Sequence, residues 1–242
     1  MSASSETMRA PEARENGLAT YIQVLYAPGE AFAKLARSPM WGWAAIAGVA
    51  LTLLATIVGM QATLHMIHAT QAQQLSQLPA EQAARQRDIL AKIPDAVYVA
   101  TTLVVAVIGP FVIWLIDSVV FLIGAALGGG EARFKYAWVA SVNAYMIASL
   151  GAVITYSIIA LHGAQNINAP SDLYALPSLA MLVHGAPKLE GLLYAYNVVN
   201  LWFYIVAVIA LERMLKLGRG AAIATVVVAS LIAAGLAAAF AK

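Results

Sequence analysis

The sequence contains no cysteine. Disulfide bridges, thiolate metal sites and thiol nucleophiles are therefore excluded, and cysteine usage gives no information about the redox compartment. Charged residues are also scarce, at 11% of the 242 residues, whereas a soluble domain has about 25%. The formal net charge of +2 is too small to indicate a nucleic-acid partner.

The sequence contains long apolar runs, in keeping with its low content of charged residues. Hydrophobic residues make up 62% of the chain, and they occur in uninterrupted segments, the pattern typical of membrane-spanning helices. Residues 1–16 are instead polar and of mixed charge. They lack the apolar core of a signal peptide, so we predict a disordered tail there and expect insertion into the membrane to depend on the internal helices.

The longest apolar run covers residues 95–127 and stops at three consecutive glycines, 128–130. Because roughly 20 apolar residues cross a ~30 Å hydrocarbon core, this run exceeds the length of one span. Pro110 removes a backbone donor and kinks a helix, and Asp117 must face protein or water because lipid does not solvate it. We therefore predict that this helix lies in the centre of a helix bundle.

The predicted fold class is all-α, a polytopic membrane helix bundle in residues 41–241. Five transmembrane spans are expected, at about 41–64, 95–127, 136–161, 189–211 and 221–241. The intervening segments 65–94 and 162–188 are too polar or too interrupted by proline to span. The last span is rich in alanine, and small residues let helices in lipid approach closely.

Residues 17–40 are predicted to form an amphipathic segment ahead of the first span. From Pro28, a favoured first helical residue, Phe32 and Leu35 share one face while the cations point elsewhere. This pattern indicates either an interfacial helix with its apolar face in the lipid headgroup boundary or an ordinary helix packed on the bundle. The side chains expected at the lipid headgroups are Lys34, Arg37, Trp41 and Trp43.

Lysine and arginine indicate the orientation of the spans. With the N-terminus inside, the cations near inner helix ends are Lys34, Arg37, Arg133, Lys135, Arg213, Lys216 and Arg219; those outside are Arg85, Arg87, Lys92, Lys188 and Lys242. The short turns at 128–135 and 213–220 determine the predicted orientation, because short loops obey the positive-inside rule best. We expect the N-terminus inside and the C-terminus outside.

Four polar residues inside the spans form a candidate site: Asp117, Asn143, Asn197 and Asn200. Counting residues from the helix ends places most of this set near mid-membrane depth. A carboxylate with amide partners at that depth is suited to binding a proton, a cation or a polar headgroup. The alternative is that these side chains only join helices, through hydrogen bonds worth about 0.6 kcal/mol each.

Three histidines form a second candidate site, for a metal ion. His65 and His68 are one helical turn apart, and His162 ends the third span on the same predicted side. Imidazole pairs of this kind bind zinc, copper or nickel, although histidine is also common at membrane interfaces. The chain carries no cofactor fingerprint and no catalytic grouping. The triple glycine is followed by Glu-Ala-Arg-Phe-Lys, which indicates a helix stop rather than a nucleotide loop.

The order of several motifs resembles the Yip-domain family of five-span membrane proteins, which are named for their interaction with Ypt/Rab GTPases. These motifs are Pro-Gly-Glu-Ala-Phe (28–32) before Trp41, GGGEARFK (128–135) opening the third span, and LWFYIVAVIALERMLKLGRGAA (201–222). The resemblance covers most of residues 25–241. It implies a non-enzymatic membrane protein that organises lipid or protein partners.

The chain departs from the eukaryotic members of that family. They carry Asp-Leu-Tyr-Gly-Pro before the first span, whereas Asp-Leu-Tyr occurs here only at 172–174, without the Gly-Pro. Tyr145 is followed by Met-Ile-Ala-Ser-Leu-Gly, without the proline that members often have. Rab binding is therefore not carried over. We expect a bacterial cytoplasmic membrane protein with lipids, and a protein at the cytoplasmic face or a second copy of the chain, as partners. A small carrier that uses Asp117 is the alternative, and an outer-face metal-binding protein a further one.

Overall fold

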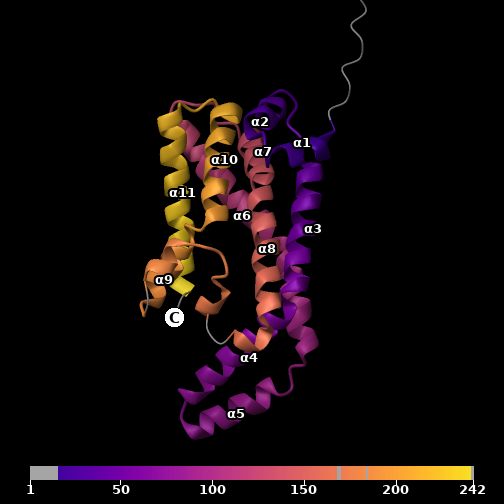
Figure 1. Ribbon diagram of the computed structural model, residues 1–242, viewed down its shortest axis with the longest axis vertical. Helices are drawn as coiled ribbons and strands as arrows, with labels where there is room; N and C mark the ends of the chain where they lie inside the picture. Colours follow the sequence, from indigo (N-terminus) through magenta and orange to yellow (C-terminus); the bar gives the residue numbers. More distant parts are fainter. Residues whose placement is uncertain (1–15, 168–169, 184, 241–242) are drawn as a thin grey trace, which may run out of the picture.

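The computed structural model describes residues 16–167, 170–183 and 185–240, and over these residues the chain is helical without a named strand. The long helices run side by side along one axis, with α1 and α2 at one end and α4 and α5 at the other (Figure 1). The predicted polar tail lies outside the described residues except for Asn16. The side-chain oxygen of Asn16 accepts from two backbone N–H groups at the start of α1 (Gly17–Gln23).

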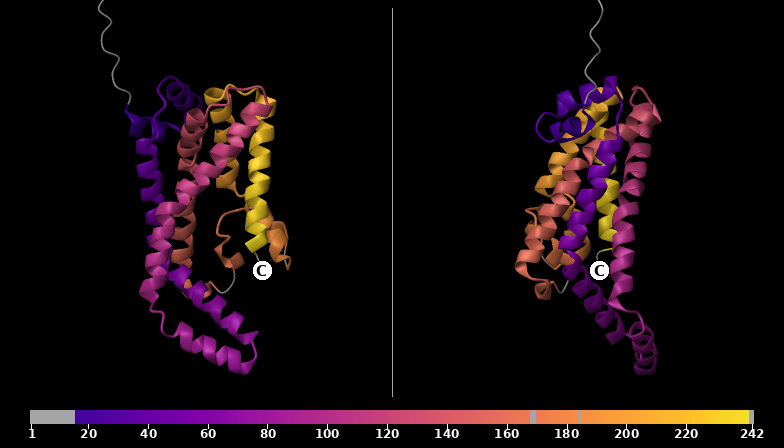
Figure 2. Two further views of the ribbon diagram at one scale, coloured as in Figure 1. Left: turned by 180° about the vertical axis from the view of Figure 1, so that it is seen from behind. Right: turned by 90° about the vertical axis from the view of Figure 1, so that its right-hand side faces the viewer.

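The longest helix, α6 (Asp95–Leu127), has the bounds that the apolar run indicated. It crosses the bundle obliquely (Figure 2, left) and packs against α3, α7 and α11. Its stop is a glycine turn in which Gly129 has a φ of 76°, a left-handed conformation that favours glycine.

The prediction that α6 lies in the centre of the bundle is wrong. Its buried residues form a single stripe at intervals of three or four: Ala106, Pro110, Trp114, Ser118, Phe121 and Ala125. The rest of its surface exposes large apolar side chains such as Val105, Val112 and Leu115. The helix is apolar all round because protein covers one face and the other faces suit lipid.

The next long helix consists of α7 (Phe134–Ala144) and α8 (Met146–His162). At the joint, the Ser149 N–H still donates to the Tyr145 carbonyl at 2.9 Å. The two segments therefore count as one helix of 29 residues. This helix and α6 are the two in the described part of the chain that are long and apolar enough to cross a membrane.

The first predicted span is not a straight helix. α3 (Gly42–Val58) and α4 (Met60–Ser76) meet at Gly59 with a bend of 61°, and the pair counts as a third spanning helix only if this broken helix is taken as one span. The Tyr156 ring of α8 packs against the break, since a Cβ on Gly59 would lie 2.1 Å from Tyr156 Cδ1. Beyond it, α4 pairs with α5 (Ala80–Leu90) outside the bundle.

The fourth predicted span also begins later than expected. After short 3-10 turns η1 (Ala164–Asn166), η2 (Pro170–Leu173) and η3 (Leu179–Leu182), the chain forms α9 (Pro187–Tyr194) and then α10 (Val198–Met214). α9 packs beside α11 (Arg219–Phe240) instead of continuing into α10. The break falls at Asn197, whose side chain caps α10.

The main core lies at the end of the bundle that carries α2 (Pro28–Arg37). Phe32 and Leu35 of α2 are at most 1% exposed and share one cluster with Leu211 and Met214 of α10. Of the two arrangements considered for this segment, the structure supports packing on the bundle. The apolar face of α2 is covered by protein and is not free to enter the headgroup region.

Candidate intramembrane polar site

A cavity of ≈ 180 Å³ lies between α6, α8, α10 and α11. Small residues from α10 and α11 form part of its wall, including Ala207 and Ala229. The polar and aromatic side chains that line it are Asp117, Phe121, Tyr145, Asn200, Phe203 and Tyr204. The cavity therefore brings together two of the four polar residues that the sequence singled out, Asp117 and Asn200.

Three of the polar groups of the cavity, Asp117, Tyr145 and Tyr204, lie at nearly the same depth. Asp117 is ten residues before the end of α6, Tyr145 is eleven residues after the start of α7, and Tyr204 is ten residues before the end of α10. At 1.5 Å per residue, each lies about 15 Å from the end of the bundle that carries α2. This depth is half the ~30 Å thickness of a hydrocarbon core.

The two polar side chains from α10 are held by one backbone carbonyl. Asn200 Nδ2 and the Tyr204 hydroxyl each donate to the Ala195 oxygen at 3.1 Å. That carbonyl belongs to the segment between α9 and α10, where the helical hydrogen-bond pattern is interrupted. The break that delays α10 thus also fixes the positions of Asn200 and Tyr204 in the cavity wall.

Asp117 is partly buried in the wall of the cavity. Within the described residues its carboxylate forms neither a hydrogen bond nor an ion pair, and the Tyr145 hydroxyl makes no hydrogen bond either. Tyr145 and Tyr204 line the same cavity as Asp117. A carboxylate and a hydroxyl without partners in one cavity can both hydrogen-bond to a bound group.

Asn143 and Asn197 do not reach the cavity. Asn143 is 2% exposed, and its Nδ2 donates to the Val139 oxygen at 2.9 Å and to the Met40 oxygen at 3.1 Å. Asn197 accepts from the backbone N–H groups of Val199 and Asn200 and donates to the Tyr194 carbonyl. Both side chains therefore satisfy backbone groups, which is the structural role that was the alternative for this set.

The three histidines are not gathered into a metal site. Among the residues that the structure describes, no three His, Asp or Glu side chains lie close enough to hold one ion. His68 Nε2 instead lies 3.0 Å from Asp95 Oδ1, and His162 Nδ1 lies 2.8 Å from the Ile158 carbonyl. His65 is partly buried on α4. The predicted grouping of His65, His68 and His162 has no support in this geometry.

The four residues expected at the lipid headgroups lie at the end of the bundle that carries α2. Trp41 and Trp43 are 45% and 56% exposed, and Arg37 is also exposed. Lys34 Nζ donates to Gln23 Oε1 at 2.7 Å. These positions suit a membrane interface, and contact with lipid stays a prediction.

Comparison with protein-family models gives a match to the Yip1 domain over residues 22–241. The chain belongs to the Yip1 domain family. The match covers nearly the whole chain and confirms the resemblance inferred from the motifs. No curated protein and no solved structure gives a match to the chain.

Together with its apolar helices, membership of the Yip1 family identifies an integral membrane protein. Sequence reasoning missed two residues of its polar cavity, Tyr145 and Tyr204. Both lie within one residue of the distance that separates Asp117 from its helix end, so this count, applied to tyrosine as well as to asparagine, would have found them. Asn143 lies at a similar distance from a helix end, but its side chain points into the protein. Counting residues along the sequence does not reveal this orientation.

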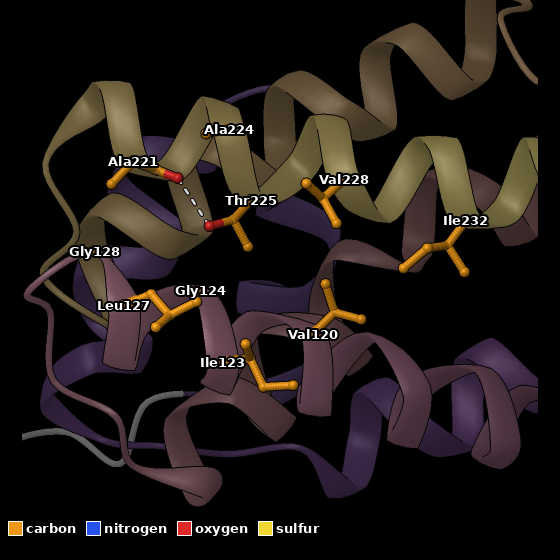
Figure 3. Close-up of a pocket in the computed structure, with 10 residues that line it drawn as sticks. All are labelled: Val120, Ile123, Gly124, Leu127, Gly128, Ala221, Ala224, Thr225, Val228 and Ile232. Carbon is orange, nitrogen blue, oxygen red and sulfur yellow. Dashed lines mark hydrogen bonds between the residues drawn. The ribbon is translucent and has the colours of Figure 1, made fainter.

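The Yip1 domain has a second cavity, of ≈ 370 Å³, between α6 and α11 (Figure 3). Its walls are apolar, with Ile123 and Leu127 of α6 opposite Val228 and Ile232 of α11. The two helices come closest at Gly124, where a Cβ would lie 2.2 Å from Thr225 Oγ1. Its lining residues include no charged group, in contrast to the polar cavity, whose wall contains Asp117.

Proposed function

We propose that this Yip1-domain protein is a non-enzymatic organiser of its membrane, which binds lipids or partner proteins at the end of the bundle that carries α2. We infer five crossings of the bilayer, formed by α3, α6, α7 with α8, α10 and α11. The shorter helices α10 and α11 support this count because they run alongside the long ones (Figure 1). Both also present large exposed apolar side chains, such as Leu201 and Val228.

The distribution of charge supports an orientation with the N-terminus inside. In the described part of the chain, seven cations and three acids lie at the end that carries α2, against four cations and five acids at the other end. The seven cations are Lys34, Arg37, Arg133, Lys135, Arg213, Lys216 and Arg219. A cytoplasmic face is the side on which such an excess is expected, and we propose the cytoplasmic membrane of a bacterium as its location.

The observation that carries the proposal is the fixed position of α2 on this cationic end. Its apolar face is buried against α10, so its polar face is held toward the solvent. Gln23 of α1, itself buried, joins Glu30 and Lys34 of α2 through contacts of 2.9 Å and 2.7 Å. Arg37 lies exposed at the end of the same helix. A rigid helix beside two short basic turns forms a surface suited to anionic lipid headgroups or an acidic protein segment.

Native mass spectrometry after reconstitution tests this surface. The protein is placed in nanodiscs of phosphatidylethanolamine with phosphatidylglycerol, and the lipid retained on release is identified. Replacing the three cations of the turn after α10 by glutamine should reduce retained phosphatidylglycerol at least several-fold. The matched control removes three cations from the opposite end and should retain the wild-type amount. The exchanged residues are Arg213, Lys216 and Arg219 in the variant, and Arg85, Arg87 and Lys92 in the control.

Equal retention by the variant and the control would refute the anionic-lipid form of the proposal. Orientation is tested separately by single cysteines, which the cysteine-free chain allows without background. A cysteine at Gly129 should be labelled by an impermeant maleimide only from inside, and one at Gln82 only from outside. The reverse pattern would overturn the orientation.

A small carrier remains the second candidate, favoured by the unpartnered carboxylate of Asp117 in a cavity at mid-depth. Transporters use intramembrane acids of this kind on ion and proton pathways. Five spans do not divide into two equal repeats, which is the common transporter arrangement. Flux measured in proteoliposomes of wild type and Asp117→Asn tests the carrier function. Flux that the variant loses supports this function, and the absence of flux in both refutes it.

A further inference from the structure

The carboxylate of Asp117 lacks a counter-charge from the protein itself. No lysine, arginine or histidine of the described residues pairs with it, and the groups that share its cavity are neutral amide, phenol, phenyl and aliphatic side chains. A charged side chain at mid-membrane depth is costly unless it pairs. A cation that enters the cavity from outside the chain provides this pairing for the ionised carboxylate.

The lining of the cavity selects the kind of cation. Magnesium and calcium need six or more oxygen ligands, and here one carboxylate is the only anionic group among the lining residues. Four aromatic side chains, Phe121, Tyr145, Phe203 and Tyr204, form part of the remaining wall, and most of the rest is aliphatic. Aromatic faces attract organic cations through their quadrupole, most strongly where water is excluded.

The size of the cavity agrees with a small organic group. Its volume of ≈ 180 Å³ is about six times the ~30 Å³ that a water molecule occupies in the liquid. An ammonium nitrogen with its attached methyl or methylene groups fits such a space, and a whole phospholipid does not. The Tyr204 hydroxyl is held by the Ala195 carbonyl, so this ring is in place before any group binds.

We propose that this cavity binds an alkylammonium group, with its nitrogen between the carboxylate of Asp117 and the rings of Tyr145 and Tyr204. An aminophospholipid headgroup and a free amine such as choline share this chemistry. The site lies about 15 Å in depth from the cationic end and does not depend on binding there. It also holds whether or not the bound group is transported.

Calorimetric titration of the purified protein in mild detergent tests the site. The probes are tetramethylammonium, ethylammonium and choline chloride, with sodium chloride at equal ionic strength as the reference. Saturable binding is expected for the organic cations and not for sodium. Asp117→Asn should weaken it at least tenfold. Asp88→Asn, which removes the same charge from the exposed surface of α5, should bind as the wild type does.

A second pair of variants separates the ring from the hydroxyl. Tyr204→Phe keeps the aromatic face and should retain binding within a few-fold, whereas Tyr204→Leu should weaken binding clearly more. If Asp117→Asn does not fold, the comparison of these two tyrosine variants tests the site in its place. The proposal is overturned if organic cations give no more heat than sodium, if folded Asp117→Asn binds like wild type, or if both tyrosine variants behave alike.

Lipid composition identifies the source of the ammonium group. Wild-type protein and Asp117→Asn are compared in nanodiscs with and without phosphatidylethanolamine. Retention of this lipid by wild type alone, with loss on addition of tetramethylammonium, supports the headgroup as the source. Choline binding that is equal in both kinds of disc supports a free amine. Ammonium binding without flux refutes the carrier function but not this site. If Asp117→Asn retains as much phosphatidylglycerol as the wild type, the cavity and the cationic end are independent sites.

Discussion

Replacing Gly124 by alanine should force α6 and α11 apart. The new Cβ would lie 2.2 Å from Thr225 Oγ1 and 2.3 Å from Thr225 Cγ2, whereas carbon atoms attract best at about 3.5–4.0 Å. The Thr225 hydroxyl donates to the Ala221 carbonyl at 2.8 Å, which holds that side chain in place (Figure 3). Overpacking of this kind costs about 1–3 kcal/mol. Three atoms of Thr225 would lie within 2.8 Å of the new Cβ, so we expect a cost in the upper part of this range, about 2–3 kcal/mol. The helix propensity of alanine returns about 1 kcal/mol, which leaves a net loss of about 1–2 kcal/mol.

Thermal unfolding in mild detergent, followed by tryptophan fluorescence, measures this loss. For a chain of this size about 1 kcal/mol lowers Tm by roughly 2–4 °C, which predicts a decrease of roughly 2–8 °C. The control is Gly109→Ala on the same helix, where the nearest atom is Val105 Cγ1 at 4.0 Å. The control should unfold at or above the wild-type temperature.

A double variant checks that the loss comes from this contact. Thr225→Gly removes the three atoms nearest to the new Cβ, so adding it to Gly124→Ala should cost much less than adding it to wild type. The reasoning fails if Gly124→Ala unfolds at the wild-type temperature, or if Gly109→Ala is equally destabilised.

Three further substitutions test a close helix contact, a helix cap and a core side chain. Gly59→Ala should cost about 1–3 kcal/mol in the same unfolding assay, because its Cβ would lie 2.1 Å from Tyr156 Cδ1, and Tyr156→Ala should relieve that cost. Asn197→Ala removes a helix cap, which costs about 1 kcal/mol, and should speed hydrogen exchange selectively in the first turn of α10. Phe32→Ala empties a fully buried site and should cost about 3–5 kcal/mol, whereas Tyr26→Ala at a 74% exposed site should stay within about 0.5 kcal/mol of wild type.

Helix length and helix ends could be predicted from the sequence where local chemistry decides them. The bounds of α6 follow from an apolar run that ends at a glycine turn. The depth of Asp117 follows from counting residues along a regular helix. These features need no knowledge of which helix lies next to which.

Features that depend on distant residues could not be predicted in this way. The bend at Gly59 is packed against Tyr156, almost a hundred residues later in the chain. The partner of the α2 apolar face is α10, and an amphipathic pattern alone does not distinguish a protein surface from a lipid surface. The polar cavity also needs the break before α10, since the carbonyl that holds Asn200 and Tyr204 is exposed by it.

The burial of α2 against α10 has a consequence for biosynthesis. Phe32 leaves the ribosome long before Leu211, with which it shares the core. At a translation rate of about 5–20 residues per second, the intervening stretch takes roughly 10–35 s to make. During that time the apolar face of α2 lacks α10, the helix against which it packs most extensively, and beyond its contacts with α1 and α7 it stays uncovered until α10 is synthesised.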